Sequence, residues 1–214
     1  MTNCSNLTCS LAETPEDRDH VYRLRYACYR RDEAIEARDD ERFHDRYDEM
    51  PNHFSFLARV GTDLPFGTVR ISVVRPESGW ETAPSHKVFG DDPAFQRIAR
   101  GSFVEASRLC FGHQARRDAL MRVIGYMAAL ADFYEVDWLV ACPRVEHSHT
   151  YERLFGFVRL AEPRQYFGVK FKTTLLGVPR ERLLQYTRGT KSMDTARLSA
   201  LSHLFAMAPV AAHL

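Results

Sequence analysis

Apolar residues recur at two different spacings along this chain of 214 residues, and the change from one spacing to the other predicts the order of its elements. Short apolar or alternating runs predict strands, because successive side chains of a strand point to opposite faces. The segments with this pattern are LTCSLAE, HFSFLARV, GTVRISVV, SFVEASRLCF, DWLVACP, FVRL and QYFGVKFKTTLL.

Helices are predicted where apolar residues lie three and four positions apart. The first begins at Pro15, because Thr14 is a favourable N-cap and Glu16 and Asp17 stand near the positive end of the helix dipole. The third helix is expected to end at Gly156. The segments predicted as helices are TPEDRDHVYRLRYACYRRDEAI, QARRDALMRVIGYMAALADFYEV, RVEHSHTYERLFG, VPRERLLQY and MDTARLSALSHLFAMA.

Two long segments carry no sustained period. EARDDERFHDRYDEMPN is dense in charge and is expected to form a long surface loop or a short helix with a loop, while RPESGWETAPSHKVFGDDPA is expected to be irregular. Loops of this length inside compact domains are commonly functional or mobile. A hairpin connection is expected at GTDLP, between HFSFLARV and GTVRISVV.

This order of elements predicts an α+β fold, in which a mixed sheet is flanked by helices and a strand–helix–strand crossover lies in the second half. A chain of this length holds one well-buried domain, which we expect over residues 1–177. A short helical extension is expected over residues 178–214. It either packs on the same domain or lies at a homodimer interface.

Composition narrows the class of protein. Hydrophobic residues make up 45% of the chain, charged residues 27%, and the net charge is +1, as in soluble globular proteins. Nucleic-acid binding is not predicted, since it requires concentrated positive charge. The N-terminus lacks the pattern of a signal peptide, and no segment approaches the roughly 18 apolar residues of a membrane span, so we expect a cytoplasmic location. The five scattered cysteines are expected to be reduced and mostly structural.

The strand FVEASRLC, residues 103–110, carries two charges in an otherwise apolar run. Burying an unpaired charge costs several kcal/mol or more, so these charges require partners if the strand is buried. Alternation places Glu105 and Ser107 on one face and Arg108 on the other, so separate partners are expected. The candidates are Arg25 on a helix flank, Arg70 in GTVRISVV, and Asp45 and Asp48 in HDRYDEM.

Together these residues resemble the acyl-homoserine-lactone synthases and the N-acyl amino acid synthases, two groups of the GNAT superfamily of N-acyltransferases. The resemblance spans roughly residues 14–172. It implies a GNAT-like, mixed and mostly antiparallel sheet flanked by helices. The residues that carry it are Arg25 with Tyr29, Asp45 and Asp48, Arg70 in GTVR, Glu105, Ser107 and Arg108 in EASR, and Tyr151 in TYERLFGF.

The chain departs from related families at two places. The segment FGHQARRDAL lacks the Gly-rich loop with which acetyltransferases bind the pyrophosphate of coenzyme A. This favours an acyl carrier protein as donor, whose acidic surface would suit Arg116, Arg117 and Arg122. The aromatic residue common in lactone synthases is also replaced, by Ala34 or Ile35. This favours the amino acid synthases.

The resemblance implies attack of an amine on a thioester. An α-amine has a pKa of about 7.7–8.0 and therefore needs only a modest base. Glu105 is the expected base, acting through water with Asp45 or Asp48 behind it. Arg70 or Arg108 is expected to bind the acceptor's carboxylate.

Further roles follow from the same resemblance. Tyr151 is expected to protonate the leaving thiolate, and backbone N–H groups where SRLCF leaves DWLVACP are expected to stabilise the oxyanion. The acceptor is expected to contact Arg25, Tyr29, Asp45, Asp48, Arg70 and Ser107, and the carrier or thioester to contact Phe111, Arg116, Arg117 and Arg122. No metal and no resident cofactor is expected, with acyl carrier protein or acyl-CoA serving as cosubstrate.

Alternatives remain at this stage. The charged residues can form a purely structural network, and Cys142 with His147 or His149 can be imagined as a nucleophilic pair, although buried cysteines more often serve as small hydrophobic residues. His147 and His149 are poorly spaced for a metal on a helix. Two other functions also fit: an acyl-homoserine-lactone synthase using S-adenosylmethionine, and a non-catalytic module that binds acyl chains or carrier protein.

Overall fold

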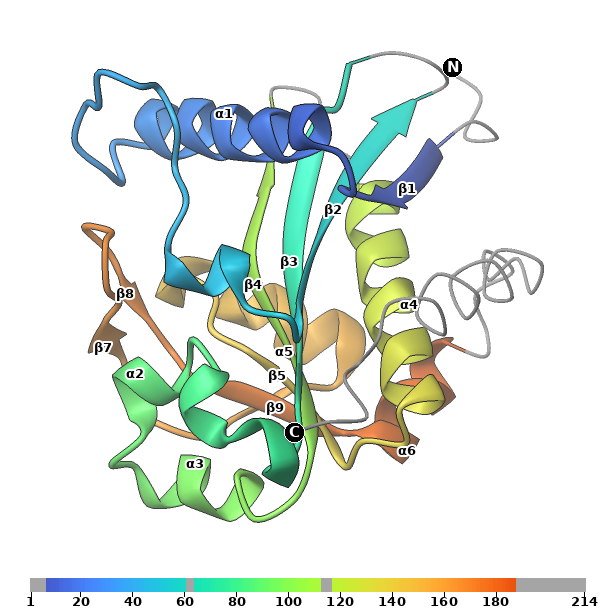
Figure 1. The fold of residues 1–214 in the computed structure, drawn as a ribbon. Coiled ribbons are helices and arrows are strands. Elements are labelled where there is room, and N and C mark those ends of the chain that lie inside the picture. Colours follow the sequence, from blue (N-terminus) through green and yellow to red (C-terminus); the bar gives the residue numbers. More distant parts are fainter. Residues whose placement is uncertain (1–6, 61–63, 113–116, 188–214) are drawn as a thin grey trace.

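The computed structural model describes residues 7–60, 64–112 and 117–187. A seven-stranded sheet crosses this part of the chain (Figure 1), in the order β1-β2-β3-β4-β5-β9-β6. Neighbouring strands are antiparallel except β4 and β5, which are parallel. The strands are β1 Leu7–Leu11, β2 His53–Val60, β3 Gly67–Val74, β4 Phe103–Phe111, β5 Trp138–Ala141, β9 Leu176–Pro179 and β6 Val158–Arg159.

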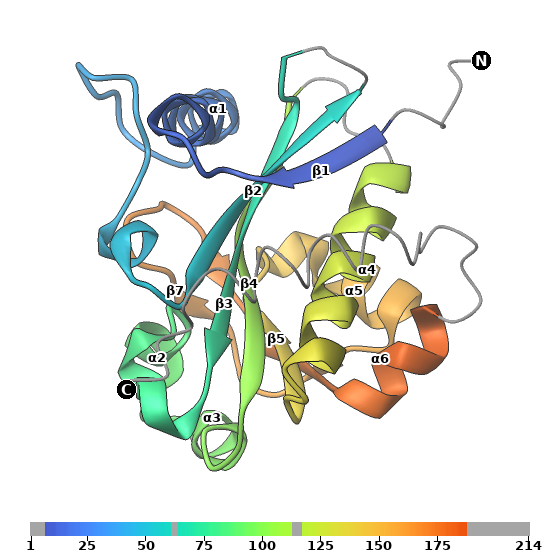
Figure 2. The same ribbon diagram turned by 45° about the vertical axis from the view of Figure 1, so that its right-hand side comes forward.

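Helices cover both faces of the sheet (Figure 2). On one side lie α1 (Pro15–Arg31), α2 (His86–Phe89) and α3 (Pro93–Ile98), and on the other lie α4 (Arg117–Phe133), α5 (Ser148–Phe155) and α6 (Arg180–Thr187). The expected cap of α1 is present, because Thr14 Oγ1 accepts from the Asp17 amide at 3.1 Å. Short 3-10 turns occupy Arg46–Glu49 (η2), Pro76–Ser78 (η3), Trp80–Thr82 (η4) and Val145–His147 (η5).

Alternation along β4 divides the core into two parts. Val104 and Ala106 pack into the cluster beneath α4, which also contains Met127 and Leu139. Phe103 faces the cluster on the α3 side. Because β4 is central in the sheet and its first six residues are buried, any charge on it is held inside the protein.

The α+β prediction is confirmed, and HFSFLARV and GTVRISVV form β2 and β3 with the predicted bounds. The prediction that QYFGVKFKTTLL forms a single strand was wrong. Gly168 turns the chain at φ 71°, so β7 (Arg164–Gln165) and β8 (Lys172–Thr173) pair as a separate hairpin and β9 follows. The segment expected to be irregular contains the short helices α2 and α3.

The C-terminal extension is described only in part. The predicted helix VPRERLLQY forms α6, which packs on α4, whereas MDTARLSALSHLFAMA lies outside the described residues. The division expected after residue 177 falls within β9. No helix among the described residues is both long and apolar enough to cross a bilayer.

Candidate active site

Asp45 joins two buried arginines from neighbouring strands. Its carboxylate accepts from Arg70 Nη1 at 2.6 Å and from Arg108 Nη2 at 2.7 Å. The position of Asp45 is fixed locally, because it caps η2 and also accepts from the Tyr47 amide at 3.0 Å. The charged segment EARDDERFHDRYDEMPN, which contains Asp45, is thus bound by ion pairs to the central strands β3 and β4.

Asp48 extends the network towards α1. Its Oδ1 accepts from Arg25 Nη1 at 2.7 Å, and its Oδ2 lies 3.2 Å from Arg70 Nη1. Arg25 also donates to Ser55 Oγ at 2.9 Å on β2. The side chains of Arg25, Arg70 and Asp48 are at most 1% exposed, so these ion pairs connect α1, η2 and the sheet inside the protein.

The electrostatics keep this network ionised. Burial acts to raise the pKa of Asp45, but the charges of Arg70 and Arg108 outweigh it and hold that pKa well below its ordinary value. Burial likewise acts to raise the pKa of Asp48, and Arg25 and Arg70 lower it overall. Three guanidinium groups therefore share two carboxylates. The network carries an excess positive charge.

Arg108 reaches Asp45 because β4 is irregular there. The pairing of β3 with β4 shifts register between Thr68 and Arg70, and Arg108 has a φ of 55°, in the left-handed region. An extra residue of this kind reverses the alternation that follows it. The prediction that Arg108 faces away from Ser107 was wrong, since Arg70 bonds to both Ser107 Oγ and Asp45 while Arg108 bonds to the same Asp45. The prediction that Glu105 and Arg108 have separate partners is confirmed, because Glu105 accepts from Ser85 and Arg108 donates to Asp45.

Glu105 is held by a serine and not by an arginine. Its carboxylate accepts from the Ser85 amide at 3.1 Å and from Ser85 Oγ at 2.6 Å. The expectation that Glu105 pairs with an opposite charge was therefore wrong for its direct partner. Burial raises the pKa of Glu105 to about 7, even though the Ser85 hydrogen bonds and the charge of Arg70 lower it. This fully buried carboxyl does not line the neighbouring cavity.

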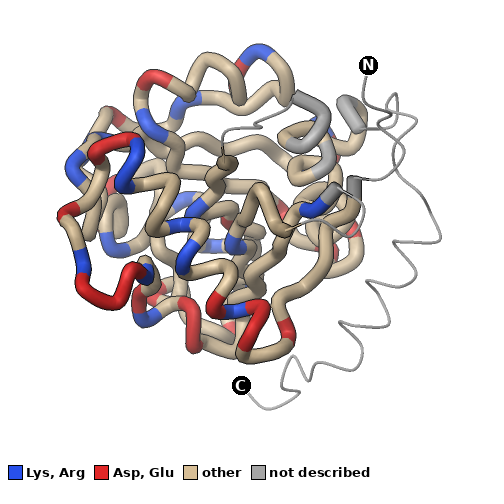
Figure 3. The backbone as a smooth tube through the Cα atoms, turned by 90° about the horizontal axis from the view of Figure 1, so that it is seen from above, with Lys and Arg blue, Asp and Glu red and all other residues tan. Residues whose placement is uncertain are grey.

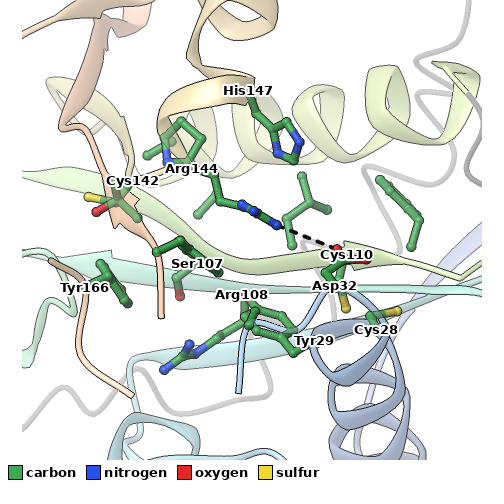
Figure 4. Close-up of a pocket in the computed structure, with 18 of the residues that line it drawn as sticks. Cys28, Tyr29, Asp32, Ser107, Arg108, Cys110, Cys142, Arg144, His147 and Tyr166 are labelled. Carbon is green, nitrogen blue, oxygen red and sulfur yellow. Dashed lines mark ion pairs between the residues drawn. The ribbon is translucent and has the colours of Figure 1, made fainter. Parts of the chain in front are cut away.

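A cavity of about 370 Å³ opens where β4 and β5 part (Figure 4). The ladder between these two strands ends at the pair Ala106–Ala141. Beyond it, the cavity is lined by the rest of β4, the segment after β5, and residues of α1 and α5. The lining includes Tyr29, Ser107, Arg108, Leu109, Phe111, Leu120, Cys142, His147, Thr150, Tyr151, Tyr166 and Thr173.

The two sides of the cavity differ in chemistry. In Figure 4, Arg108, Tyr29 and Tyr166 lie on one side of the β4 ribbon and His147 lies on the other. The guanidinium of Arg108 stands among aromatic rings, 4.5 Å from the ring centre of Phe43 and 5.6 Å from that of Tyr166. Burial and the neighbouring Tyr29 raise the pKa of Tyr151, so its hydroxyl keeps its proton.

The expected site residues divide into two groups. Tyr29, Ser107, Arg108, Phe111 and Tyr151 line the cavity. The others form the buried support behind it: Arg25, Asp45, Asp48 and Arg70 in the ion-pair network, and Glu105 beside Ser85. Arg116 lies outside the described residues, and of Arg117 and Arg122 the structure describes only the backbone, in α4.

The alternative chemistries find little support in this arrangement. Burial raises the pKa of the Cys142 thiol well above its ordinary value, which disfavours the thiolate that a nucleophile requires. Within residues 7–60, 64–112 and 117–187, no group of three or more His, Cys, Asp or Glu side chains is placed to hold a metal.

Basic and acidic residues are interspersed along the chain in Figure 3.

Ser85 and Tyr166 are among the residues of the site that were missed from the sequence. Ser85, the partner of Glu105, stands before the short helix α2, and Tyr166 follows β7 and lines the cavity. Only Gly168, a break inside an aromatic run, gave a signal that the segment around Tyr166 turns rather than continuing as a strand.

A model of a protein family, described as the N-acyl amino acid synthase FeeM, matches residues 20–179. The chain belongs to the FeeM family of N-acyl amino acid synthases. As a member of this family, the protein is an N-acyltransferase. A search among curated proteins finds no match.

Solved structures agree with this assignment at the level of the fold. FeeM, an N-acyl amino acid synthase from uncultured soil microbes, is 16% identical with a TM-score of 0.68, over 86% of this chain and 95% of that one. The acyl-homoserine-lactone synthase LasI is 14% identical, with a TM-score of 0.58 over 81% and 90%. The CoA-dependent acyl-homoserine lactone synthase BjaI is 20% identical, with a TM-score of 0.56 over 91% and 98%. The GNAT-like fold implied by the resemblance is confirmed.

Proposed function

We propose that this FeeM-family N-acyltransferase moves a long-chain acyl group from the thioester of an acyl carrier protein to the α-amine of an amino acid. One observation carries the proposal: a cavity at the parting of β4 and β5 is lined both by apolar side chains, among them Leu109, Phe111 and Leu120, and by the buried guanidinium of Arg108. Such a cavity suits two substrates, an acyl thioester and a small molecule that bears a carboxylate.

The donor fits the end of the β4–β5 ladder. A thioester carbonyl placed just beyond Ala106 and Ala141 lies next to backbone N–H groups that no longer face a partner strand. Such preorganised donors stabilise the oxyanion of the tetrahedral intermediate. Phe111, Leu109 and Leu120 line the cavity and provide apolar contacts for the chain.

The amine nitrogen then attacks the carbonyl carbon, its proton passes to a base, and the C–S bond breaks as the thiolate takes a proton. Glu105 suits the base because its pKa of about 7 lies near the working pH. It acts through water, since its carboxylate does not line the cavity. Tyr151 lines the cavity with its proton retained, and we assign it to the leaving thiolate.

Between the two arginines considered for the acceptor's carboxylate, the geometry favours Arg108. Arg70 is fully buried and directs its guanidinium to Ser107, Asp45 and Asp48. Arg108 lines the cavity and pairs with Asp45 only through Nε and Nη2. The excess positive charge of the network is therefore available at Arg108.

We assign the carrier to the arginines at sequence positions 116, 117 and 122, because arginines suit an acidic protein surface and Leu120, between them in the sequence, lines the cavity. Acyl-CoA is the other donor that the chemistry admits. We place the reaction in the cytoplasm, because Cys28, Cys110 and Cys142 are free thiols, as in a reducing compartment.

The test combines purified protein, a long-chain acyl group on either acyl carrier protein or CoA, the standard amino acids and S-adenosylmethionine, with products read by mass spectrometry. An N-acyl amino acid formed faster from the carrier-protein donor is expected. An acyl lactone would replace the proposal with a lactone synthase, and donor binding without any product would contradict catalysis of this reaction.

A further inference from the structure

Tyr166 is a buried residue of the cavity with an unsatisfied hydroxyl. It follows β7, is 5% exposed and lines the cavity. Its hydroxyl oxygen is buried, and none of the described residues lies within hydrogen-bonding distance of it. Leaving a buried hydroxyl without a partner destabilises the free protein. An orphan of this kind in a cavity indicates that a ligand supplies the missing partner.

A second hydroxyl from the same hairpin repeats the pattern. Thr173 of β8 is fully buried and lines the cavity, and its Oγ1 also has no hydrogen-bond partner among the described residues. The β7–β8 hairpin pairs Arg164 with Thr173 and is separate from the main sheet. The hairpin thus brings two free hydroxyls to one cavity.

The surroundings of Tyr166 favour an anion as the missing partner. The guanidinium of Arg108 lies 5.6 Å from its ring centre, and both residues are on the same side of β4 (Figure 4). Burial and the charge of Glu105 raise the pKa of Tyr166 well above its ordinary value, so the phenol stays protonated and acts as a donor. A neutral donor beside a cation matches a carboxylate oxygen.

We infer that the Tyr166 hydroxyl donates a hydrogen bond to the α-carboxylate of the acceptor, and with Arg108 selects acceptors that carry a free carboxylate. This inference rests on the proposed function and adds a specificity-determining residue to it. Tyr166 holds the acceptor in place and exchanges no proton with it. The carboxylate restores the hydrogen bond that the free enzyme lacks.

The test compares Tyr166→Phe with the parent protein on two acceptors: the standard amino acid that the parent acylates fastest, and the primary amine in which hydrogen replaces the carboxylate of that amino acid. Loss of a hydrogen bond to a charged group predicts that the KM for the amino acid rises about 10-fold or more, with kcat little changed. The KM for the amine is expected to stay the same. Tyr134→Phe removes the same atom from a buried tyrosine that does not line the cavity, and is the matched control.

Each other result overturns the inference. Equal loss of kcat with both acceptors would place Tyr166 at the oxyanion instead, and unchanged kinetics with the amino acid would give it no role in recognition. Failure of the parent protein to acylate any amino acid would overturn the proposed function as well, so the two failures are distinguishable. The thermal midpoint of the free Tyr166→Phe protein is expected to be equal to or above that of the parent, which separates lost recognition from lost folding.

Discussion

Glu105→Gln is expected to gain stability relative to the parent protein as the pH rises from about 5 to 8. The Glu105 carboxyl is fully buried, and burial raises its pKa from 4.5 to about 7. A carboxyl whose folded-state pKa lies above its unfolded value favours the folded state most below the unfolded pKa. That contribution is lost as the pH rises through about 7. Glutamine stays neutral throughout and avoids the loss.

The magnitude follows from the two pKa values. Each pKa unit corresponds to about 1.4 kcal/mol, so ionising Glu105 in the folded protein costs about 3 kcal/mol once the pH exceeds both values. Most of this, about 2–3 kcal/mol, develops between pH 5 and pH 8. The substitution also changes the hydrogen bonds from Ser85, and this shifts the difference in the free energy of unfolding between the two proteins by a constant amount. The pH dependence is governed by the carboxyl.

The assay is urea unfolding of both proteins at pH 5, 6.5 and 8, with the free energy of unfolding of Glu105→Gln minus that of the parent as the measured quantity. This difference is expected to increase by about 2–3 kcal/mol from pH 5 to pH 8. The same exchange at exposed Glu77 controls for the substitution itself. A difference that stays flat across this range would refute the reasoning, because Glu105 would then ionise as an ordinary carboxyl.

The same variant separates the catalytic and structural roles of Glu105. If Glu105 is the base, the variant is more stable at pH 8 yet loses most of its turnover, while donor binding persists. If its role is structural, turnover follows stability. A stable variant with full turnover would remove Glu105 from the mechanism and leave the base to be found among the groups that line the cavity.

Three further substitutions test the support around the site. Asp45→Asn leaves Arg70 and Arg108 without their shared carboxylate. It is expected to lower the free energy of unfolding, measured in urea at pH 7, by about 3–5 kcal/mol. A decrease below about 1 kcal/mol would show that these ion pairs contribute no more than surface pairs. Thr14→Ala removes the N-cap of α1 and is expected to cost about 1 kcal/mol by the same measurement. Gly156→Ala puts a side chain at φ 69° after α5 and is expected to lower the free energy of unfolding by about 1–2 kcal/mol. An unchanged free energy of unfolding would show that this turn relaxes.

Much of the fold could be predicted because its signals are local. Apolar alternation defines β2 and β3, and a cap followed by proline defines the start of α1. The contacts of Glu105 could not be predicted in the same way. Its partner Ser85 lies 20 residues earlier, in a segment without a period, and no local pattern reports which hydroxyl a buried carboxylate will meet.

The sequence indicated that arginines and aspartates pair inside the protein, but it did not indicate the geometry of these pairs. A strict period of two places Arg108 opposite Ser107, but the left-handed residue at 108 inserts one position and turns its side chain towards Asp45. Left-handed backbone is normally signalled by glycine or asparagine, and an arginine gives no such signal. The strain is compensated by contacts made only in the folded protein, namely the ion pair with Asp45 and the surrounding aromatic rings.

Both features on which the proposed chemistry depends lie at this irregularity. Up to Ala106, β4 pairs regularly with β5, and beyond it the ladder ends and the cavity begins. At the same place the reversed alternation brings a guanidinium to the cavity and ties it to the loop that carries Asp45. A regular strand would point Arg108 to the other face. The charge of Arg108 makes FVEASRLC a poor core strand, yet the bulge requires it. The ion pair of Arg108 with Asp45, which also binds Arg70, offsets the free-energy cost of the left-handed backbone.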